Sequence, residues 1–541
     1  MANSTCSNLI EKNSQLALDI LVSAAFIFVL CFFFEPQWET NDDVAMSMVA
    51  HGYGIAAVGM PNLIFSNVLW GYLVRAIPQI DGVLGYSIAT IGVLFIVGAV
   101  VLHAFRKLGV GWLASLLVLI FLFARPVLFP QFTINAGLLT VGAVVCWHVY
   151  AHQRSRLMLL AGCILAFGGY LVRSHEFLLV LLVALPLLPW LKWTKDRTAQ
   201  ASSLALLLAI GTAAFIDSQA YKGENWKAFN SLNPARAPIT DFGADAHLKS
   251  RPDILDRHGY SENDIDLINS WFFVDSEIAN PVALNAMLTE LGPLPASSIA
   301  LNNGWIGIKT FTHPVLLPGF FAALLLLLLF PNRKLFFTWA LCLAVFFALG
   351  VSGRPSILRV YIPVISLLIV APLLVPGTGN REYGNLRKRF ALGVLVVAAL
   401  FNTTAVFSES RAAQIVSDQK RMSLQGFPEE IVVVWGATFP FEAAYPVLKQ
   451  SDSAMAYKIY GMGVFTLAPF STAYGQEISG NGMLNRLASK NGIPILAKKH
   501  HFAFLDVYCK ERLSGVLHTL GIKEYGALSV RVIRCESVLD Q

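Results

Sequence analysis

The sequence predicts a mainly α-helical, polytopic membrane protein of about eleven transmembrane helices, with a small extracytoplasmic α/β domain at its C-terminus. Only 14% of the 541 residues are charged, whereas a soluble domain carries about 25%. The mean hydropathy is +0.60, and several apolar runs reach the roughly 20 residues that a helix needs to cross the hydrocarbon core. This composition excludes a soluble enzyme, a secreted disulfide scaffold and a disordered protein.

The apolar runs predict eleven spans, whose boundaries are good to a few residues. They are 17–34, 83–104, 108–128, 134–151, 157–172, 176–192, 201–217, 314–331, 335–351, 359–376 and 389–407. The first follows a polar N-terminus with little positive charge and lacks a small-residue cleavage site. We therefore expect a retained anchor rather than a cleaved signal peptide.

Basic residues fall in alternate loops between these spans. The five basic loops contain Arg106 and Lys107; Arg154 and Arg156; Lys192, Lys195 and Arg197; Arg333 and Lys334; and Arg381, Arg387, Lys388 and Arg389. The positive-inside rule places these loops and the N-terminus in the cytoplasm and the C-terminus outside, in what we expect to be a bacterial inner (plasma) membrane. The net charge of +6 therefore reflects topology and does not indicate a nucleic-acid partner.

This topology divides the chain into a transmembrane module, 1–407, with large outer loops at 35–82 and 218–312, and an extracytoplasmic domain, 408–541. In that domain 431–435 and 527–533 are strand-like, and 441–449 and 481–490 are predicted helices. Cys509 and Cys535 both fall there. On the oxidising side of the membrane they could form a disulfide, and two buried free thiols are the alternative.

The first outer loop opens with an acidic stretch, Glu35-Pro36-Gln37-Trp38-Glu39-Thr40-Asn41-Asp42-Asp43. One carboxylate can act as a general base on a hydroxyl while a neighbour binds a cation or the substrate. Asp42 and Asp43 are therefore candidate catalytic residues, and Glu39 is a candidate substrate ligand. Alternatively, Asn41 or Asp42 caps a helix at 43–50, and both interpretations can hold together. The following segment 61–70 is amphipathic and predicts a surface-lying helix.

Arginines occur where the predicted topology puts the outer face. An arginine at such a helix end needs a partner, and guanidinium groups match phosphate oxygens geometrically. For a single arginine, snorkelling to the interface or a salt bridge, such as Arg173 with Glu176, is the simpler explanation. As a set facing an acidic loop, they indicate a site for a lipid-linked phosphate. The candidate ligands are Arg75, Arg125, Arg173, His175, Arg354 and Arg359.

Several familiar signatures are absent from the sequence. It contains no Walker A loop, H-E-x-x-H motif, G-x-S-x-G elbow or dinucleotide fingerprint. The predicted spans also lack the mid-membrane acidic residues that mark ion coupling. A sugar transfer on the outer face would therefore need an activated donor carried in the membrane.

The layout resembles the GT-C superfamily of polytopic glycosyltransferases. In that superfamily the first span leads to an outer loop with an acidic pair, here Asp42-Asp43, and a second large outer loop lies between spans seven and eight, here 218–312. A soluble outer domain after the last span, here 408–541, is also common. The segments 226–230 and 259–264 resemble parts of uncharacterised bacterial envelope proteins with a similar Asn-Asp-Asp opening.

The resemblance implies inverting transfer of a hexosyl or pentosyl unit from a polyprenyl phosphate or pyrophosphate to a glycan, lipid or protein acceptor. Asp42 or Asp43 would deprotonate the acceptor hydroxyl, and Mg²⁺ or Mn²⁺ held by the pair could join the arginines in stabilising the leaving phosphate. One alternative is an O-antigen polymerase or ligase. The others are a glycan-lipid transporter or flippase, which broken helices in matching halves would favour, and a scaffold for an envelope complex.

Overall fold

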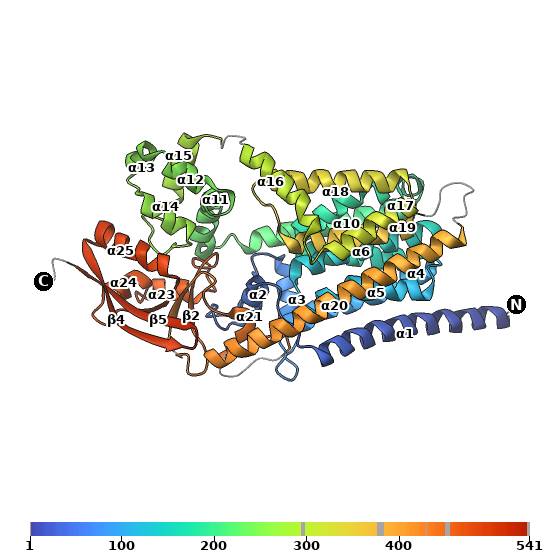
Figure 1. Cartoon of the computed structure of the whole chain (residues 1–541), viewed down its shortest axis with the longest axis horizontal. Helices are drawn as coiled ribbons and strands as arrows, with labels where there is room; N and C mark the ends of the chain where they lie inside the picture. The colour runs from blue at the N-terminus through green and yellow to red at the C-terminus, as the bar shows by residue number, and fades with distance from the viewer. Residues whose placement is uncertain (1, 294–297, 376–383, 429, 449–454, 538–541) are drawn as a thin grey trace. The chain divides into compact units, whose positions relative to one another are not determined.

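The computed structural model describes residues 2–293, 298–375, 384–428, 430–448 and 455–537. Its contacts gather into two compact units, each assembled from three separate segments of the chain (Figure 1). We call 1–39, 64–217 and 301–414 the helical unit, and 40–63, 218–300 and 415–541 the sheet unit. The predicted division into 1–407 and 408–541 stays a prediction.

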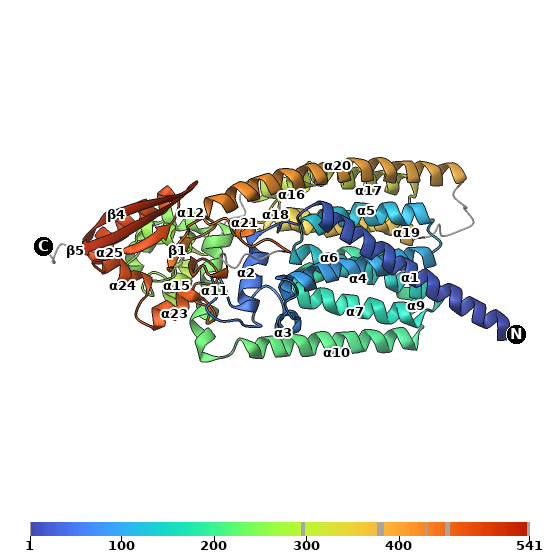
Figure 2. The same cartoon turned by 90° about the horizontal axis from the view of Figure 1, so that it is seen from below.

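Long apolar helices running side by side make up the helical unit (Figure 2). In chain order they are α1 (Ala2–Phe33), α3 (Val68–Ala76), α4 (Gly85–Lys107), α5 (Trp112–Leu128), α6 (Phe132–Gln153), α7 (Arg156–Val172), α8 (Ser174–Ala184), η1 (Leu185–Leu187), α9 (Trp190–Trp193), α10 (Arg197–Ala220), α16 (Ser298–Lys309), η3 (Thr310–Thr312), α17 (Leu317–Leu329), α18 (Arg333–Val351), α19 (Leu358–Leu374) and α20 (Asn385–Ser423).

Ten of the eleven predicted spans fall on a single helix of this set, the exception being 176–192, and the chain is an integral membrane protein. Within the described residues, six helices are long and apolar enough to cross a membrane alone. The pair 300–312 and 317–329, bent by 87°, makes a seventh if it counts as one span. Four more apolar helices are shorter. The count of eleven therefore stays a prediction, and the predicted span end at 376 and Arg381 lie outside the described residues.

The predicted span 176–192 is not one continuous helix. It is broken into α8, the 3-10 turn η1 and the short α9. Pro186 and Pro189 explain the break, because proline removes a backbone donor and clashes with the preceding turn.

The most deeply buried helix of the helical unit is α6. Every side chain of its apolar stretch is buried, and α6 packs on α4, α7, α8 and α19. Glycines allow this close packing: a Cβ added at Gly137 would lie 2.3 Å from the Pro363 Cβ of α19, and one at Gly162 on α7 would lie 2.7 Å from the Trp147 ring. Small residues at such contacts let helix backbones approach where lipid supplies no hydrophobic drive.

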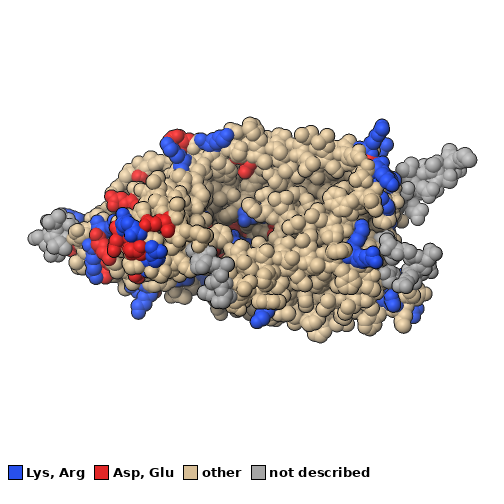
Figure 3. All heavy atoms as spheres, turned by 90° about the horizontal axis from the view of Figure 1, so that it is seen from above, with Lys and Arg blue, Asp and Glu red and all other residues tan. Residues whose placement is uncertain are grey.

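Lys and Arg side chains gather at one end of the helical unit, which we call the basic end (Figure 3). Gln153 at the end of α6 donates to the Lys107 carbonyl at the end of α4. Arg154, which follows α6, pairs with Asp196, which precedes α10. This grouping is what the positive-inside rule requires of loops that share one side, while the absolute orientation stays a prediction.

One carboxylate is buried within the first helix, close to the basic end. Asp19 is completely buried, and its oxygens lie 2.9 Å from His103 Nδ1 and 2.8 Å from Arg106 Nη1, both on α4. A carboxylate inside a membrane helix is tolerated when it is paired in this way. The cluster therefore fastens α1 to α4.

A five-stranded mixed sheet organises the sheet unit, as the predicted small α/β domain requires. Its order is β2-β1-β3-β5-β4: β1 is parallel to β2 and β3, and β5 is antiparallel to β3 and β4. The strands are β1 (Val432–Trp435), β2 (Ile459–Met462), β3 (Ile493–Leu496), β4 (Gly515–Tyr525) and β5 (Leu528–Ser537). The predicted strands at 431–435 and 527–533 are thus confirmed as β1 and β5.

The two helices predicted for the C-terminal domain have different outcomes. The helix at 481–490 appears as α24 (Met483–Ala488), whereas the one at 441–449 is reduced to α21 (Phe441–Ala444), with residue 449 outside the described range. The helix stops because Tyr445 precedes Pro446, and a residue before proline is pushed out of the α region.

The second large loop folds onto the sheet as helices. These are α11 (Lys227–Phe242), α12 (Ala244–Lys249), α13 (Pro252–His258), α14 (Glu262–Asn269) and α15 (Pro281–Leu291). Phe272 packs with its ring centroid 5.5 Å from that of Trp435 on β1, and the Tyr508 hydroxyl donates to Asp275 at 2.8 Å. Tyr508 lies on α25 (Lys499–Leu513). One hydrophobic core thus joins residues from both parts of the sequence.

A disulfide also stabilises the sheet unit. Cys509 on α25 is bonded to Cys535 on β5, with the two Cα atoms 5.9 Å apart. It closes a loop that contains β4, the long edge strand, and so fixes the edge of the sheet against the helix that covers it.

Candidate functional site

The acidic pair lies in the first turn of α2 (Asn41–His51), in the sheet unit. The N-cap is Thr40, not Asn41 or Asp42, so the helix begins two residues before the predicted 43–50. Asp43 is completely buried, and the Thr40 hydroxyl donates to its Oδ2 at 3.4 Å. Asp42 is half-buried. Both acids are favoured here by the positive end of the helix dipole.

The segment after α2 attaches this acidic helix to the edge of the sheet. Ile459 on β2 donates to the Gly54 carbonyl at 3.0 Å, and Ala57 donates to the Phe470 carbonyl at 2.8 Å. The Tyr53 and Tyr445 rings pack with their centroids 5.3 Å apart. The first outer loop therefore supplies Asp42 and Asp43 to the sheet unit.

A third carboxylate lies near Asp42. Glu442 is on α21, which contacts α2. Burial raises the pKa of Glu442, and the charge of Asp42 raises it further. Sequence reasoning missed this residue because it is 400 positions away. Within the described residues, no group of three or more His, Cys, Asp or Glu side chains is arranged to hold a metal ion, so the Mg²⁺ or Mn²⁺ expected at Asp42 and Asp43 stays a prediction.

The surface helix expected at 61–70 begins later than predicted. The structure has α3 at Val68–Ala76, because Asn67 caps it by accepting from the Leu69 N–H at 3.0 Å. Arg75 lies in its last turn and is exposed, and no described residue forms an ion pair with it. Arg75 therefore has no described acid to offset its charge, unlike Arg125.

Arg125 is the centre of a buried ion cluster at the far end of the helical unit, where α5 and α7 finish. Its guanidinium Nη2 donates to both oxygens of Glu39 at 3.0 Å, and Nη1 donates to Glu409 on α20 at 2.6 Å. Burial raises the pKa of Glu39, and the charge of Arg125 opposes that rise. Glu409 is a second acidic partner of Arg125, and no sequence motif points to it.

Arg173 and Glu176 form a second cluster where α7 turns into α8. The Arg173 guanidinium donates to the Phe65 carbonyl at 3.1 Å and stacks on the rings of Phe65 and Phe132, 5.4 and 5.3 Å from their centroids. Glu176 is buried, and His175 beside it is exposed. A pinned cation next to a buried carboxylate can offer part of its donor set to an anionic ligand.

The charge of Arg359 acts on an acid in each of these two clusters. Arg359 is the second residue of α19, and its charge acts on both Glu39 and Glu176. Arg354, in the exposed turn before α19, acts on His175. Four of the five predicted arginines therefore converge on one end of the helical unit, together with acids that offset part of their charge.

Buried polar atoms without a hydrogen-bond partner in the described structure gather at the same end. A buried donor or acceptor left unpaired costs about 1–3 kcal/mol, so such groups normally bind water or a ligand. In the sequence, two of these residues stand out as polar side chains in an apolar stretch, at positions 131 and 135. The atoms are Arg125 Nε, Gln131 Nε2, Asn135 Oδ1 and Glu176 Oε1.

Comparisons with known proteins give one structural similarity. No protein-family model matches the chain, and no curated protein does. Among solved structures, the chain is similar to one described as the crystal structure of ArnT from Cupriavidus metallidurans bound to undecaprenyl phosphate. The alignment covers 96% of this chain and 97% of that one, at 12% sequence identity and a TM-score of 0.35.

Proposed function

We propose that the chain is a membrane glycosyltransferase that moves a sugar from a polyprenyl-phosphate-linked donor to a hydroxyl of an envelope glycan, lipid or protein. The convergence of Arg173, Arg354 and Arg359 with buried, unpaired polar atoms at the far end of the helical unit carries this proposal. A lipid-linked sugar phosphate offers a phosphate anion to the guanidinium groups and sugar hydroxyls to the buried amide and carboxylate atoms.

In this proposal the arginines have different roles. Arg173, Arg354 and Arg359 bind the donor phosphate and stabilise the charge that develops on it as the bond to the sugar breaks. Arg125 already pairs with two carboxylates, so we assign it the positioning of Glu39, whose carboxylate contacts a sugar hydroxyl. Removing a charge from the first group would weaken donor binding, whereas removing Arg125 would disorder its acidic partner.

Asp42 is the proposed general base, because it is half-buried whereas Asp43 is inaccessible and held by Thr40. The acceptor hydroxyl gives its proton to the Asp42 carboxylate, and its oxygen attacks the anomeric carbon. The bond from that carbon to the phosphate oxygen breaks, and its electron pair leaves with the lipid phosphate. The single displacement inverts the anomeric configuration. Glu442 beside Asp42 supplies a second carboxylate for orienting the acceptor.

A matched set of variants tests this assignment. Asp42→Asn keeps size while removing basicity, and we expect a loss of ~10²–10⁴-fold in transfer rate with donor binding retained. Asp81→Asn is the control, because Asp81 is exposed and has a positive φ of 48°, which asparagine also adopts. The assay uses purified full-length protein in lipid with radiolabelled polyprenyl-phosphate sugars. Full turnover by the Asp42→Asn variant would contradict the mechanism.

The orientation is a separate part of the proposal. We place the N-terminus in the cytoplasm and the far end of the helical unit outside a bacterial inner membrane, on the basis of the grouped basic loops. A reporter fused after residue 541 should be active only if it is of a kind that works after export. Activity of a cytoplasmic reporter at that position would imply an even number of spans.

A glycan-lipid transporter is the second candidate, because one apolar helix pair, 300–312 and 317–329, is bent by 87°. Transporters often use broken helices in corresponding places of two halves, and the described residues contain a single bent pair of this kind. Movement of a lipid-linked sugar across vesicles without sugar transfer, unaffected by Asp42→Asn, would favour this alternative.

A further inference from the structure

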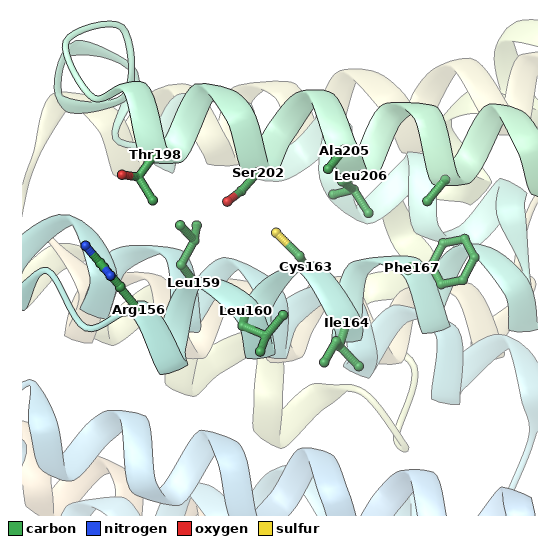
Figure 4. Close-up of a pocket in the computed structure, with 11 residues that line it drawn as sticks. Arg156, Leu159, Leu160, Cys163, Ile164, Phe167, Thr198, Ser202, Ala205 and Leu206 are labelled. Carbon is green, nitrogen blue, oxygen red and sulfur yellow. The ribbon is translucent and has the colours of Figure 1, made fainter.

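A cavity of ≈ 390 Å³ lies between α7 and α10 in the helical unit (Figure 4). One side is formed by α7 side chains from Arg156 to Phe167, and the other by α10 side chains from Thr198 to Ala209. Figure 4 shows Leu159 and Cys163 of α7 projecting toward α10, and Ser202 and Leu206 of α10 projecting toward α7. Of the residues of α10, only Ala199 and Ala213 are buried.

The cavity changes character along its length. Arg156 and Thr198 lie at one end, whereas Ile164, Phe167 and Leu206 line the other (Figure 4). Arg156 and Phe167 are eleven positions apart on α7, which corresponds to about 16 Å of helix. That is about half of the ~30 Å hydrocarbon thickness, so the apolar part matches one chain of a lipid in a single leaflet.

Charge indicates which lipid would fit the polar end. Arg156 is the first residue of α7, and its N-cap, Ser155, makes no side-chain capping bond. The Met158 N–H bonds to the Ser155 carbonyl, which leaves the N–H groups of Arg156 and Leu157 for an anion. The nearby Asp196 is already neutralised by Arg154 and accepts from the Thr198 N–H at 3.0 Å. This end is also the basic end of the unit, and basic pockets between helices on that side are suited to anionic headgroups.

We propose that this cavity binds one anionic phospholipid of the leaflet at the basic end, with an acyl chain between α7 and α10 and its phosphate at Arg156 and the Thr198 hydroxyl. The bound chain fills the space that the two helices leave open and so holds α10 against the bundle. This site is separate from the proposed donor site, which lies at the opposite end of α7, and it does not depend on the proposed transfer reaction.

Native mass spectrometry of the full-length protein tests the proposal. The protein is reconstituted with equal amounts of phosphatidylglycerol and phosphatidylcholine that carry identical chains, and the lipids retained after detergent extraction are counted. We expect one phosphatidylglycerol to be retained in preference to phosphatidylcholine. Arg156→Gln should reduce that preference several-fold, while Arg333→Gln, which removes an exposed charge at the start of α18, should leave it unchanged.

A second pair of variants tests the acyl-chain part. Ala205→Trp places a large ring in the cavity, whereas Leu208→Trp places the same ring on α10 at a side chain that is 63% exposed and does not line the cavity. Only Ala205→Trp should abolish retention of the lipid. Equal retention of the two lipids by the wild-type protein, or equal effects of the two tryptophan variants, would overturn the proposal, even if the transferase activity were confirmed.

Discussion

Replacing Gly137 with alanine tests whether α6 and α19 pack as closely as the structure describes. The new Cβ would lie 2.3 Å from Pro363 Cβ and 2.5 Å from Pro363 Cγ, whereas non-bonded carbons rest at about 3.5–4.0 Å. The proline ring cannot rotate away, so the two helices must separate by at least ~1.2 Å. We expect a loss of about 1–3 kcal/mol in stability, the usual cost of overpacking a tight core.

Gly92 on α4 provides the matched control. A Cβ added there meets nothing within 4 Å, so Gly92→Ala should gain about 0.5–1 kcal/mol by removing a flexible residue from a helix. Thermal unfolding of the two purified full-length variants in one detergent should therefore give Tm shifts of opposite sign. Gly137→Ala should also weaken donor binding, because Arg359 precedes Pro363 by one helical turn. A Gly137→Ala protein as stable as Gly92→Ala would refute the close contact.

Three further predictions follow from buried charges and the disulfide. Arg125→Met should cost about 1–3 kcal/mol because it leaves the partly buried Glu39 unpaired. Adding Glu39→Gln should restore much of the Tm, and no recovery would contradict that origin. Mass-resolved thiol labelling of denatured protein should count two more thiols after reduction, from Cys509 and Cys535, and equal counts before and after reduction would exclude the bond. Cys509→Ser should lower stability by about 3 kcal/mol. Burial lowers the pKa of His501 to about 4, so protonation favours the unfolded state. Stability should therefore fall as the pH is lowered from about 6.5 to 4. His501→Phe should flatten this pH profile of stability, and an unchanged profile would contradict the assignment.

The sequence predicted the parts of the fold that depend on hydropathy and local pattern. Apolar runs located the helices of the membrane region, a continuous β-branched run located β1, and an alternating pattern located β5. Breaks were harder to predict: the continuous span 176–192 overlooked the effect of Pro186 and Pro189. Local capping was also misassigned, because Thr40 rather than Asn41 takes the N-cap of α2.

The partners of the predicted site residues could not be found from sequence. Glu409 meets Arg125, and Glu442 approaches Asp42, only because helices distant in the chain pack together. Neither glutamate lies in a motif or has distinctive neighbours. Conversely, Arg75 satisfied the same charge rule as the other arginines, yet it is exposed and forms no ion pair with a described residue. Hydropathy indicates at which end of a helix a charge lies, but not which neighbour it faces.

The interleaving of the sheet unit limits how this protein can be engineered or dissected. A fragment that begins at 408 contains all five strands but lacks the helices of 218–300, whose side chains fill the same hydrophobic core as Trp435 and Tyr460. It also lacks 40–63, which adds backbone hydrogen bonds beside β2. The C-terminal region therefore cannot be moved to another protein as an independent domain. A chimera that exchanges it between proteins must exchange three segments at once, and one of these carries the acidic pair.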